Sequence, residues 1–165
     1  MKDAPKDEKD ILKELDSLLD FRKRGIDLNL QRMKKALIEM DEPCKSIPAI
    51  QIVGTNGKGS ISSFLESSLK ELGIKSGITT SPHLVSWCER IRINTSPIDI
   101  YVFKKHLTSI QKVIERHRLT PFETVIAIAL NHFRIEKIEL LVLEAGLGGR
   151  LDATTAHPYR PIIAI

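Results

Sequence analysis

Residues 52–64 read IVGTNGKGSISSF, and this stretch determines how the rest of the chain is interpreted. The run from Ile50 to Val53 is mostly apolar, which predicts a buried strand. A turn with glycines at positions 54, 57 and 59 follows, and a segment with helical periodicity begins directly after it. Strand, tight loop and helix in this order predict a phosphate-binding loop in an α/β fold.

The residue types in this loop suit a nucleoside triphosphate. Glycines allow successive backbone N–H groups to point at a phosphate, and the N-terminus of the next helix adds partial positive charge. Lys58 supplies a full charge for the β- and γ-phosphates, and the Ser60 hydroxyl suits Mg²⁺. The residues that we expect to contact ATP are Gly54, Thr55, Asn56, Gly57, Lys58, Gly59 and Ser60.

The spacing of the loop differs from the strict P-loop pattern. Only two residues separate Gly54 from Gly57, and Gly59 lies between Lys58 and Ser60. An ordinary strand-to-helix turn is therefore the alternative interpretation. The lysine and the hydroxyl in this context favour phosphate binding.

Composition is typical of one globular domain. The chain has 165 residues, of which 42% are hydrophobic and 28% charged, and its net charge is +4. This small basic excess suits anionic small molecules and does not indicate a nucleic-acid partner. The two cysteines have no metal-binding or redox spacing, the start of the chain lacks the apolar core of a signal peptide, and we expect no membrane segment. We therefore predict a cytoplasmic protein.

Helical periodicity predicts two helices before the first strand and one after the loop. The first has apolar residues at positions 11, 12, 15, 18 and 19 and a stop at Gly25, and the second has them at 30, 33, 37 and 40. The helix after the loop is expected to end at Gly73. Its predicted buried residues are Ile61, Phe64, Leu65, Leu69 and Leu72.

Downstream, a short strand over Lys75–Thr80 runs into a loop that begins Ser81-Pro82-His83. Two capping boxes, at residues 96–99 and 120–123, predict helices, the second reaching about Ile135. Histidines 106, 117 and 132 fall on helices whose faces do not converge in the sequence, so no role is predicted for them.

A second candidate functional residue is Glu144. It follows the apolar run Leu140–Leu143, which predicts a buried parallel strand with a carboxylate at its C-terminal end. This is where P-loop enzymes place an acid linked to Mg²⁺. Pairing of Glu144 with a lysine is the structural alternative. Pro161–Ile165 begins one more apolar strand, which suggests a truncated or partial protein.

Several segments together resemble the folylpolyglutamate synthase and dihydrofolate synthase family of the Mur ligase superfamily. They are Ile26-Asp27-Leu28 with Arg32, GTNGKGS at 54–60, SPHL at 81–84 with Glu89-Arg90-Ile91, Phe122-Glu123, and EAGLGGRLDAT at 144–154. The resemblance implies a Rossmann-like parallel sheet flanked by helices, of the Mur-ligase central-domain type. It divides the chain into a helical lead-in, 1–47, and an incomplete ATP-binding domain, 48–165, without the glutamate-binding domain.

The resemblance also implies an activity, ATP-dependent addition of L-glutamate to a folate or to dihydropteroate through an acyl phosphate, in a monomer. Lys58 and Glu144 would be catalytic, and Ser60, Ser81 and Glu144 would hold Mg²⁺. The residues that match folate-lining stretches are Ile26, Asp27, His83, Thr120, Pro121, Phe122, Glu123, Leu151, Asp152 and Ala153. For Thr120 and Glu123 this competes with the capping interpretation.

Two departures from the family pattern are visible. Family members often carry asparagine at the position of Thr155 and glycine near Asp41-Glu42. Two other functions stay open, namely a different ligase of the superfamily and a non-catalytic nucleotide-binding module. The loop SPHL and the ending GKGS argue against the first of these.

Overall fold

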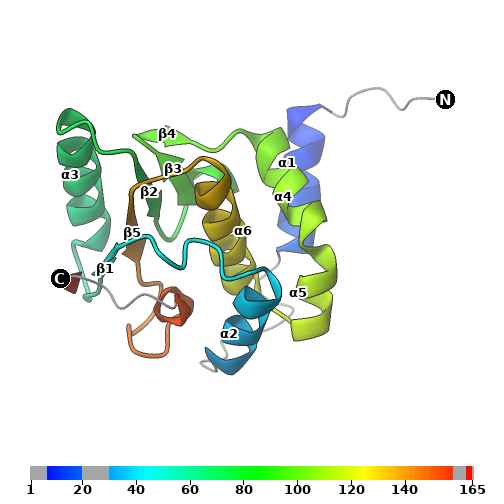
Figure 1. Cartoon of the computed structure of the whole chain (residues 1–165). Coiled ribbons are helices and arrows are strands. Elements are labelled where there is room, and N and C mark those ends of the chain that lie inside the picture. Colours follow the sequence, from blue (N-terminus) through cyan, green and yellow to red (C-terminus); the bar gives the residue numbers. More distant parts are fainter. Residues whose placement is uncertain (1–6, 20–29, 158–162, 165) are drawn as a thin grey trace.

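The computed structural model describes residues 7–19, 30–157 and 163–164, and within them the centre is a six-stranded sheet of order β4-β3-β2-β5-β1-β6 (Figure 1). Neighbours in the run β2-β5-β1-β6 are parallel, and β3 and β4 continue the sheet antiparallel. The strands are β1 (Ala49–Ile52), β2 (Ser76–Thr79), β3 (Ile91–Ile93), β4 (Ser96–Pro97), β5 (Leu140–Glu144) and β6 (Ile163–Ala164). The predicted α/β class with a largely parallel sheet is confirmed.

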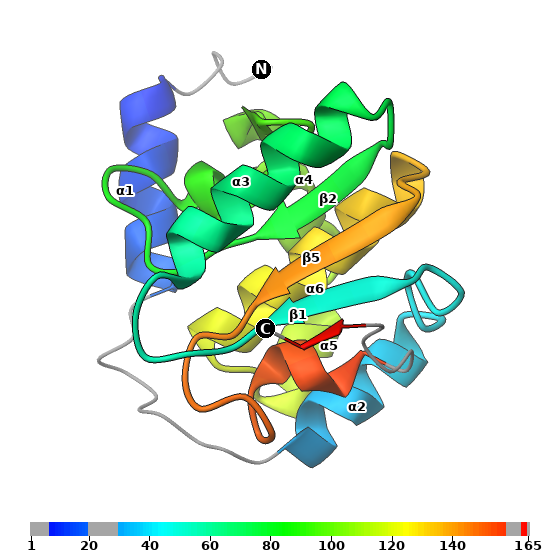
Figure 2. The ribbon, with the colours of Figure 1, turned by 90° about the vertical axis from the view of Figure 1, so that its left-hand side faces the viewer.

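Register brings the loops that carry the candidate residues together. Ile52 of β1 pairs with Glu144 of β5, and Thr79 of β2 pairs with Leu143 of β5. These three strands therefore end at one edge of the sheet, where loops carry function in parallel folds. Figure 2 shows the segments that follow them leaving the sheet on the same side.

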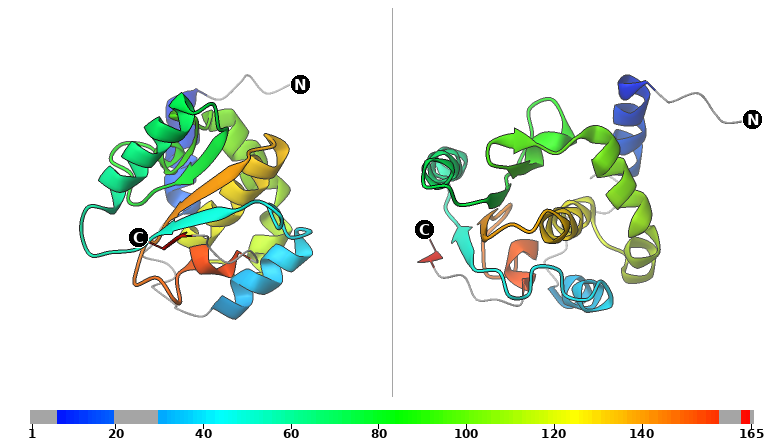
Figure 3. Two further views of the ribbon diagram at one scale, coloured as in Figure 1. Left: turned by 60° about the vertical axis from the view of Figure 1, so that its left-hand side comes forward. Right: turned by 45° about the horizontal axis from the view of Figure 1, so that its top comes forward.

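Helices cover both faces of the sheet. Helix α3 lies on one face and α6 on the other, with α2 beside α6, and α1, α4 and α5 lie further from the sheet beyond α6 (Figures 1 and 3). The α-helices are α1 (Glu8–Leu18), α2 (Leu30–Glu39), α3 (Lys58–Glu71), α4 (Ile100–Ser109), α5 (Gln111–His117) and α6 (Pro121–Ile135), and two short 3₁₀ helices are η2 (Trp87–Arg90) and η3 (Ala153–Ala156). The predicted stop at Gly25 lies outside the described residues. Among those residues no helix has the length and hydropathy needed to cross a membrane.

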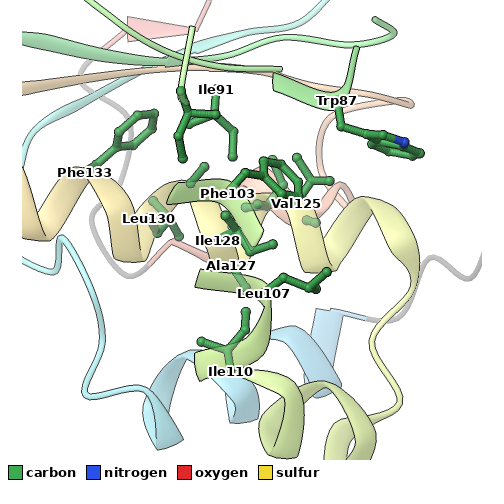
Figure 4. Close-up of a cluster of buried hydrophobic side chains, with 14 of the residues drawn as sticks. Trp87, Ile91, Phe103, Leu107, Ile110, Val125, Ala127, Ile128, Leu130 and Phe133 are labelled. Atoms are coloured by element: carbon green, nitrogen blue, oxygen red, sulfur yellow. The ribbon is translucent and has the colours of Figure 1, made fainter. Parts of the chain in front are cut away.

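Helix α6 is the centre of the larger hydrophobic core. Residues 125–130 are all buried, because the sheet covers one side of the helix and α4 the other. Figure 4 shows Phe103 and Leu107 of α4 beside Val125 and Ile128 of α6. A Cβ on Gly77 of β2 would lie 2.7 Å from atoms of Phe133 and Ile138, so the missing side chain lets α6 pack closely on the sheet.

The predicted buried face of helix α3 is confirmed in part. Leu69 is buried, and Ile61 and Leu65 pack against the same core, but Phe64 and Leu72 are 74% and 73% exposed. The prediction also missed Ser62 and Glu66, which are buried because they have polar partners at the edge of the sheet. The predicted end of α3 is confirmed, since Gly73 adopts φ of 72° after its last turn.

One of the two predicted capping boxes is wrong. Ser96 and Pro97 form β4, and the N-cap of α4 is Asp99, whose carboxylate accepts the N–H groups of Tyr101 and Val102. The box of Thr120 and Glu123 at α6 is confirmed in both directions.

The backbone just after α2 is left-handed at two residues that are not glycine. Asp41 and Glu42 have φ of 62° and 41° just after α2. Glycine adopts this conformation at little cost, whereas side chains with a Cβ are strained in it. A glycine at this helix end, as the resemblance leads us to expect, would avoid that strain.

The prediction that the histidines do not converge is wrong for two of them. His106 of α4 and His132 of α6 are buried, and Nε2 of His106 lies 3.2 Å from Nδ1 of His132. Burial, helped by the neighbouring His132 and Lys105, lowers the pKa of His106 to about 4, and burial also lowers that of His132. The contact forms because α4 packs against α6 at His132. The periodicity of either segment alone does not reveal which residues of the other helix it will meet.

This buried pair predicts a loss of stability in acid. His106 stays neutral in the folded chain down to a pKa of about 4, whereas an unfolded histidine takes up a proton near about pH 6.5. The unfolded state therefore binds more protons between these values, and the unfolding temperature should fall as pH falls from about 6.5 to about 4. Thermal unfolding across this range should show a shallower decline for His106→Asn. Equal slopes for the parent and the variant would contradict the assignment.

Candidate active site

The loop between β1 and α3 has the conformation of an anion-binding turn. Gly57 is left-handed, with φ of 78°, and serves as the N-cap of α3, which begins at Lys58. The Nζ of Lys58 donates to the carbonyl of Gly54 at 2.9 Å, so the ammonium group folds back over the loop. Because α3 begins at Lys58, Gly59 and Ser60 lie in its first turn, where backbone N–H groups have no partner within the helix.

Glu144 lies against the first turns of α3. Ser62 donates its hydroxyl to Oε2 of Glu144 at 3.3 Å, and a Cβ built on Gly59 would lie 4.0 Å from the same oxygen. The residue is 3% exposed. Burial raises the pKa of Glu144, whereas the hydroxyl of Ser62 and the charge of Lys58 act against that rise. A backbone hydrogen bond with Ser81, just after β2, also lowers the pKa of Glu144. The glycine loop, the acid and the end of β2 therefore meet at this point.

The donors at this edge fit a hard divalent cation. Glu144 offers a carboxylate, and Ser60 and Ser81 offer hydroxyl oxygens, which are the atoms that Mg²⁺ prefers. Within residues 7–19, 30–157 and 163–164 no group of three or more His, Cys, Asp or Glu side chains is placed to hold a metal. A cation here would therefore use few protein ligands and would take phosphate oxygens as well, as Mg²⁺ commonly does.

The loop after β2 is held by Glu89. Its carboxylate accepts the backbone N–H groups of Leu84, Val85 and Ser86 at 2.9, 2.8 and 2.6 Å. These hydrogen bonds lower the pKa of Glu89. Trp87 then anchors the loop to α1, because its indole N–H donates to Asp16 at 2.7 Å. The tryptophan is buried and therefore acts as a packing anchor for this loop.

His83 has a defined tautomer in this loop. The Nε–H of Arg90 donates to Nδ1 of His83 at 2.7 Å, and the guanidinium group has no acceptor atom. A neutral imidazole must then carry its proton on Nε2. Burial and the charge of Arg90 both lower the pKa of His83, which favours this neutral form. The ring also contacts Trp87 in a tilted arrangement, with ring centroids 4.5 Å apart and an interplanar angle of 56°.

Asp152 organises the loop after β5. One carboxylate oxygen accepts the N–H groups of Gly146 and Leu147, and the other accepts the N–H and hydroxyl of Thr154. Asp152 and Ala153 are buried, and Leu151 is 44% exposed. A Cβ on Gly146 would lie 2.9 Å from the ring of Phe122, so the N-terminus of α6 packs directly under this loop.

Thr120 and Glu123 have structural partners of their own. Glu123 accepts the N–H and hydroxyl of Thr120 and the Nε–H of Arg32, which belongs to α2. Thr120, Pro121 and Glu123 are buried, and Phe122 is half-buried. Among the predicted folate-lining residues, Ile26 and Asp27 lie outside the described residues. The others come from the loops after β2 and β5 and from the start of α6.

Two polar residues beside the site were missed in the sequence. Ser62 contacts Glu144, and Glu66 pairs with Arg92 at 2.8 Å and accepts the N–H of Thr95. The available signal was the spacing of Lys58, Ser62 and Glu66, which places three polar residues on one face of α3.

Comparison with known proteins places this geometry in a family. A scan against protein-family models gives no match. A probable dihydrofolate synthetase of Schizosaccharomyces pombe is 39% identical over 142 residues, which are 85% of this chain and 34% of the relative. The dihydrofolate synthase/folylpolyglutamate synthase of Bacillus subtilis is 36% identical over 151 residues, covering 87% of this chain and 34% of the relative. The chain is a relative of the dihydrofolate synthase and folylpolyglutamate synthase family. It spans about a third of the length of these curated relatives.

Solved structures of folylpolyglutamate synthases have the same fold. The Mycobacterium tuberculosis enzyme, complexed with ADP, superposes with a TM-score of 0.84 at 33% identity, over 90% of this chain and 35% of that one. A bifunctional folylpolyglutamate synthase/dihydrofolate synthase with Mn, AMPPNP and L-glutamate bound gives a TM-score of 0.81 at 31% identity, over 91% of this chain and 37% of that one. The resemblance to synthases read from the sequence is confirmed.

Proposed function

We propose that this chain is the ATP- and folate-binding part of an ATP-dependent ligase that adds L-glutamate to dihydropteroate, to a tetrahydrofolate, or to both. The observation that carries the proposal is the meeting of the glycine loop and Glu144 at the carboxyl edge of the sheet. The synthases in the comparison, one of them complexed with ADP, support it.

In the proposed reaction a carboxylate oxygen of the folate attacks the γ-phosphorus of ATP, which gives an acyl phosphate and ADP. The amine of glutamate then attacks the acyl carbon, expels phosphate and loses a proton. The difficulty is to bring anions together and to stabilise the transferring phosphoryl group. The N–H groups of residues 54–60 and the ammonium of Lys58 would bind the phosphates, and this reaction needs no covalent nucleophile on the protein.

Glu144, Ser60 and Ser81 would hold the divalent cation. When bound, Mg²⁺ neutralises phosphate charge and orients the phosphates. Burial raises the pKa of Glu144, and the Ser62 hydroxyl and the Lys58 charge limit that rise. A cation bound beside the carboxyl group would favour its charged form.

The folate would lie between the loops after β2 and β5 and the N-terminus of α6. His83 would offer its Nε2–H as a donor, and Phe122 and Leu151 would offer apolar surface. The carboxylates of Asp152 and Glu123 are engaged with backbone and side-chain donors, so they would act by holding this wall in place.

The wider organisation belongs to the same proposal. The protein would work as a monomer in the cytoplasm on small molecules, with ATP, a folate or dihydropteroate and L-glutamate as substrates and Mg²⁺ as cofactor, and without nucleic acid or membrane. Residues 1–47 would be a helical lead-in and residues 48–165 the ATP-binding domain.

Turnover measurements test the proposal. The 165-residue chain is incubated with ATP, Mg²⁺, dihydropteroate and L-glutamate, and ADP and dihydrofolate are measured by chromatography. Even if the chain does not turn over, we expect calorimetry to show that it binds ATP and dihydropteroate specifically. Formation of ADP and of a glutamylated product would exclude the non-catalytic module. Binding of a nucleotide-linked sugar peptide in preference to dihydropteroate would favour another ligase of the superfamily, and no ATP binding would overturn the proposal.

A further inference from the structure

Ser62 forms an unusual hydrogen bond for a serine inside a helix. Such hydroxyls commonly bond the carbonyl four residues earlier, as Ser68 does to Phe64 at 2.9 Å and Thr108 does to Lys104 at 3.0 Å. Ser62 instead reaches out of α3 to Oε2 of Glu144 on β5. Its hydroxyl is therefore used for a contact between the helix and the sheet.

The hydrogen bond between Ser62 and Glu144 is shielded from solvent. Ser62 is 0% exposed and Glu144 is 3% exposed, so neither group is well placed to exchange its partner for bulk water. A hydroxyl or a carboxylate buried without a partner is costly, and each group here meets that need for the other. Alanine has the higher helix propensity, so the hydroxyl of Ser62 contributes through its hydrogen bond to the carboxylate and not through the stability of the helix itself.

The charged residues on either side of Ser62 along α3 have partners of their own, which leaves the Ser62 hydroxyl to orient Glu144. Glu66, one turn further along α3, is neutralised by Arg92, so it does not compete for Ser62. Lys58, one turn earlier, lies at the phosphate loop and folds back to Gly54. Ser62 is thus the residue between the nucleotide loop and this ion pair that touches the acid directly.

We propose that Ser62 is a positioning residue that holds the Glu144 carboxylate in the orientation required to bind a divalent cation beside the nucleotide. The inference rests on the proposed function, because it assumes that Glu144 is a metal ligand. Groups that hydrogen-bond a ligating carboxylate commonly change metal affinity by about 10- to 100-fold when removed. Ser62 should therefore affect the cation and not the nucleotide alone.

The test separates these two affinities in the full 165-residue chain. Manganese binding is titrated by electron paramagnetic resonance at saturating AMPPNP, and AMPPNP binding without metal is measured by calorimetry. Ser62→Ala should weaken manganese binding by about tenfold and leave metal-free AMPPNP affinity within about twofold of the parent. Ser62→Thr, which keeps the hydroxyl, should recover most of the manganese affinity. Ser63→Ala is the matched control, because Ser63 is exposed on the same turn.

Each alternative result overturns the inference in a recognisable way. Manganese affinity within twofold of the parent in Ser62→Ala, with a large loss in Glu144→Gln, would remove the role of Ser62 and leave the proposed function standing. An equal loss of both affinities in Ser62→Ala would mean a general structural role. If Ser62→Thr lost as much manganese affinity as Ser62→Ala while circular dichroism showed a folded chain, the hydroxyl would be excluded as the cause of the effect. Absence of manganese binding in the parent would overturn both this inference and the proposed metal site.

Discussion

Lys58→Ala should weaken ATP binding by about a hundredfold while the fold stays intact. The ammonium of Lys58 lies over the glycine loop, where it donates to the carbonyl of Gly54 and would turn to the phosphates of a bound nucleotide. A hydrogen bond between charged groups contributes about 1.5–3 kcal/mol, which corresponds to roughly a 10- to 150-fold change in affinity. Calorimetric titration of AMPPNP into the parent and the variant measures this change.

Lys70→Ala is the matched control for this experiment. Lys70 is exposed in the last turn of the same helix, where it donates to the hydroxyl of Thr95, so the variant removes the same charge far from the loop. Its nucleotide affinity should stay within about twofold of the parent at physiological ionic strength, because exposed charges beyond a Debye length are screened. Equal affinities for the parent and for Lys58→Ala would refute the assignment of the loop.

Glu123→Ala should destabilise the chain by about 3 kcal/mol, because breaking a buried ion pair is strongly destabilising. The variant removes the carboxylate that pairs with Arg32 and half of the capping box of α6 at once. Arg32 is largely buried, with 18% of its side chain exposed, and α6 is the central helix of the core. In thermal unfolding we expect a decrease of about 9 °C in the midpoint.

Two further variants identify the origin of the effect. Glu123→Gln keeps a capping side chain but removes the charge, so its loss of stability should be smaller than that of Glu123→Ala. Glu71→Ala removes an exposed glutamate from the end of α3 and should change stability by less than about 0.5 kcal/mol. If Glu123→Ala unfolded at the parent temperature, the ion pair and the cap would have no energetic importance.

Local patterns account for the parts of the fold that were predicted. The strand, loop and helix at residues 50–71, the capping box of α6 and the strand before Glu144 each depend on residues close together in the chain. Parallel strands also have their carboxyl ends at one edge of the sheet as a rule, which is why the sequence alone places Glu144 near the loop. The glycines and the lysine of the loop carry the chemistry of phosphate binding in their residue types alone.

By itself the sequence determined the strand, glycine loop and helix at residues 50–71, the order of the elements and the family to which the chain is related. Only the tertiary structure decided that Ser62 and Glu66 of α3 are buried, that Ser62 donates to Glu144, and that His106 meets His132. The physical reason is that these contacts join residues 26 and 82 positions apart. Periodicity describes how one helix alternates between apolar and polar residues, whereas a polar residue turns inward when another element supplies its partner, and that partner is known only once the chain has folded.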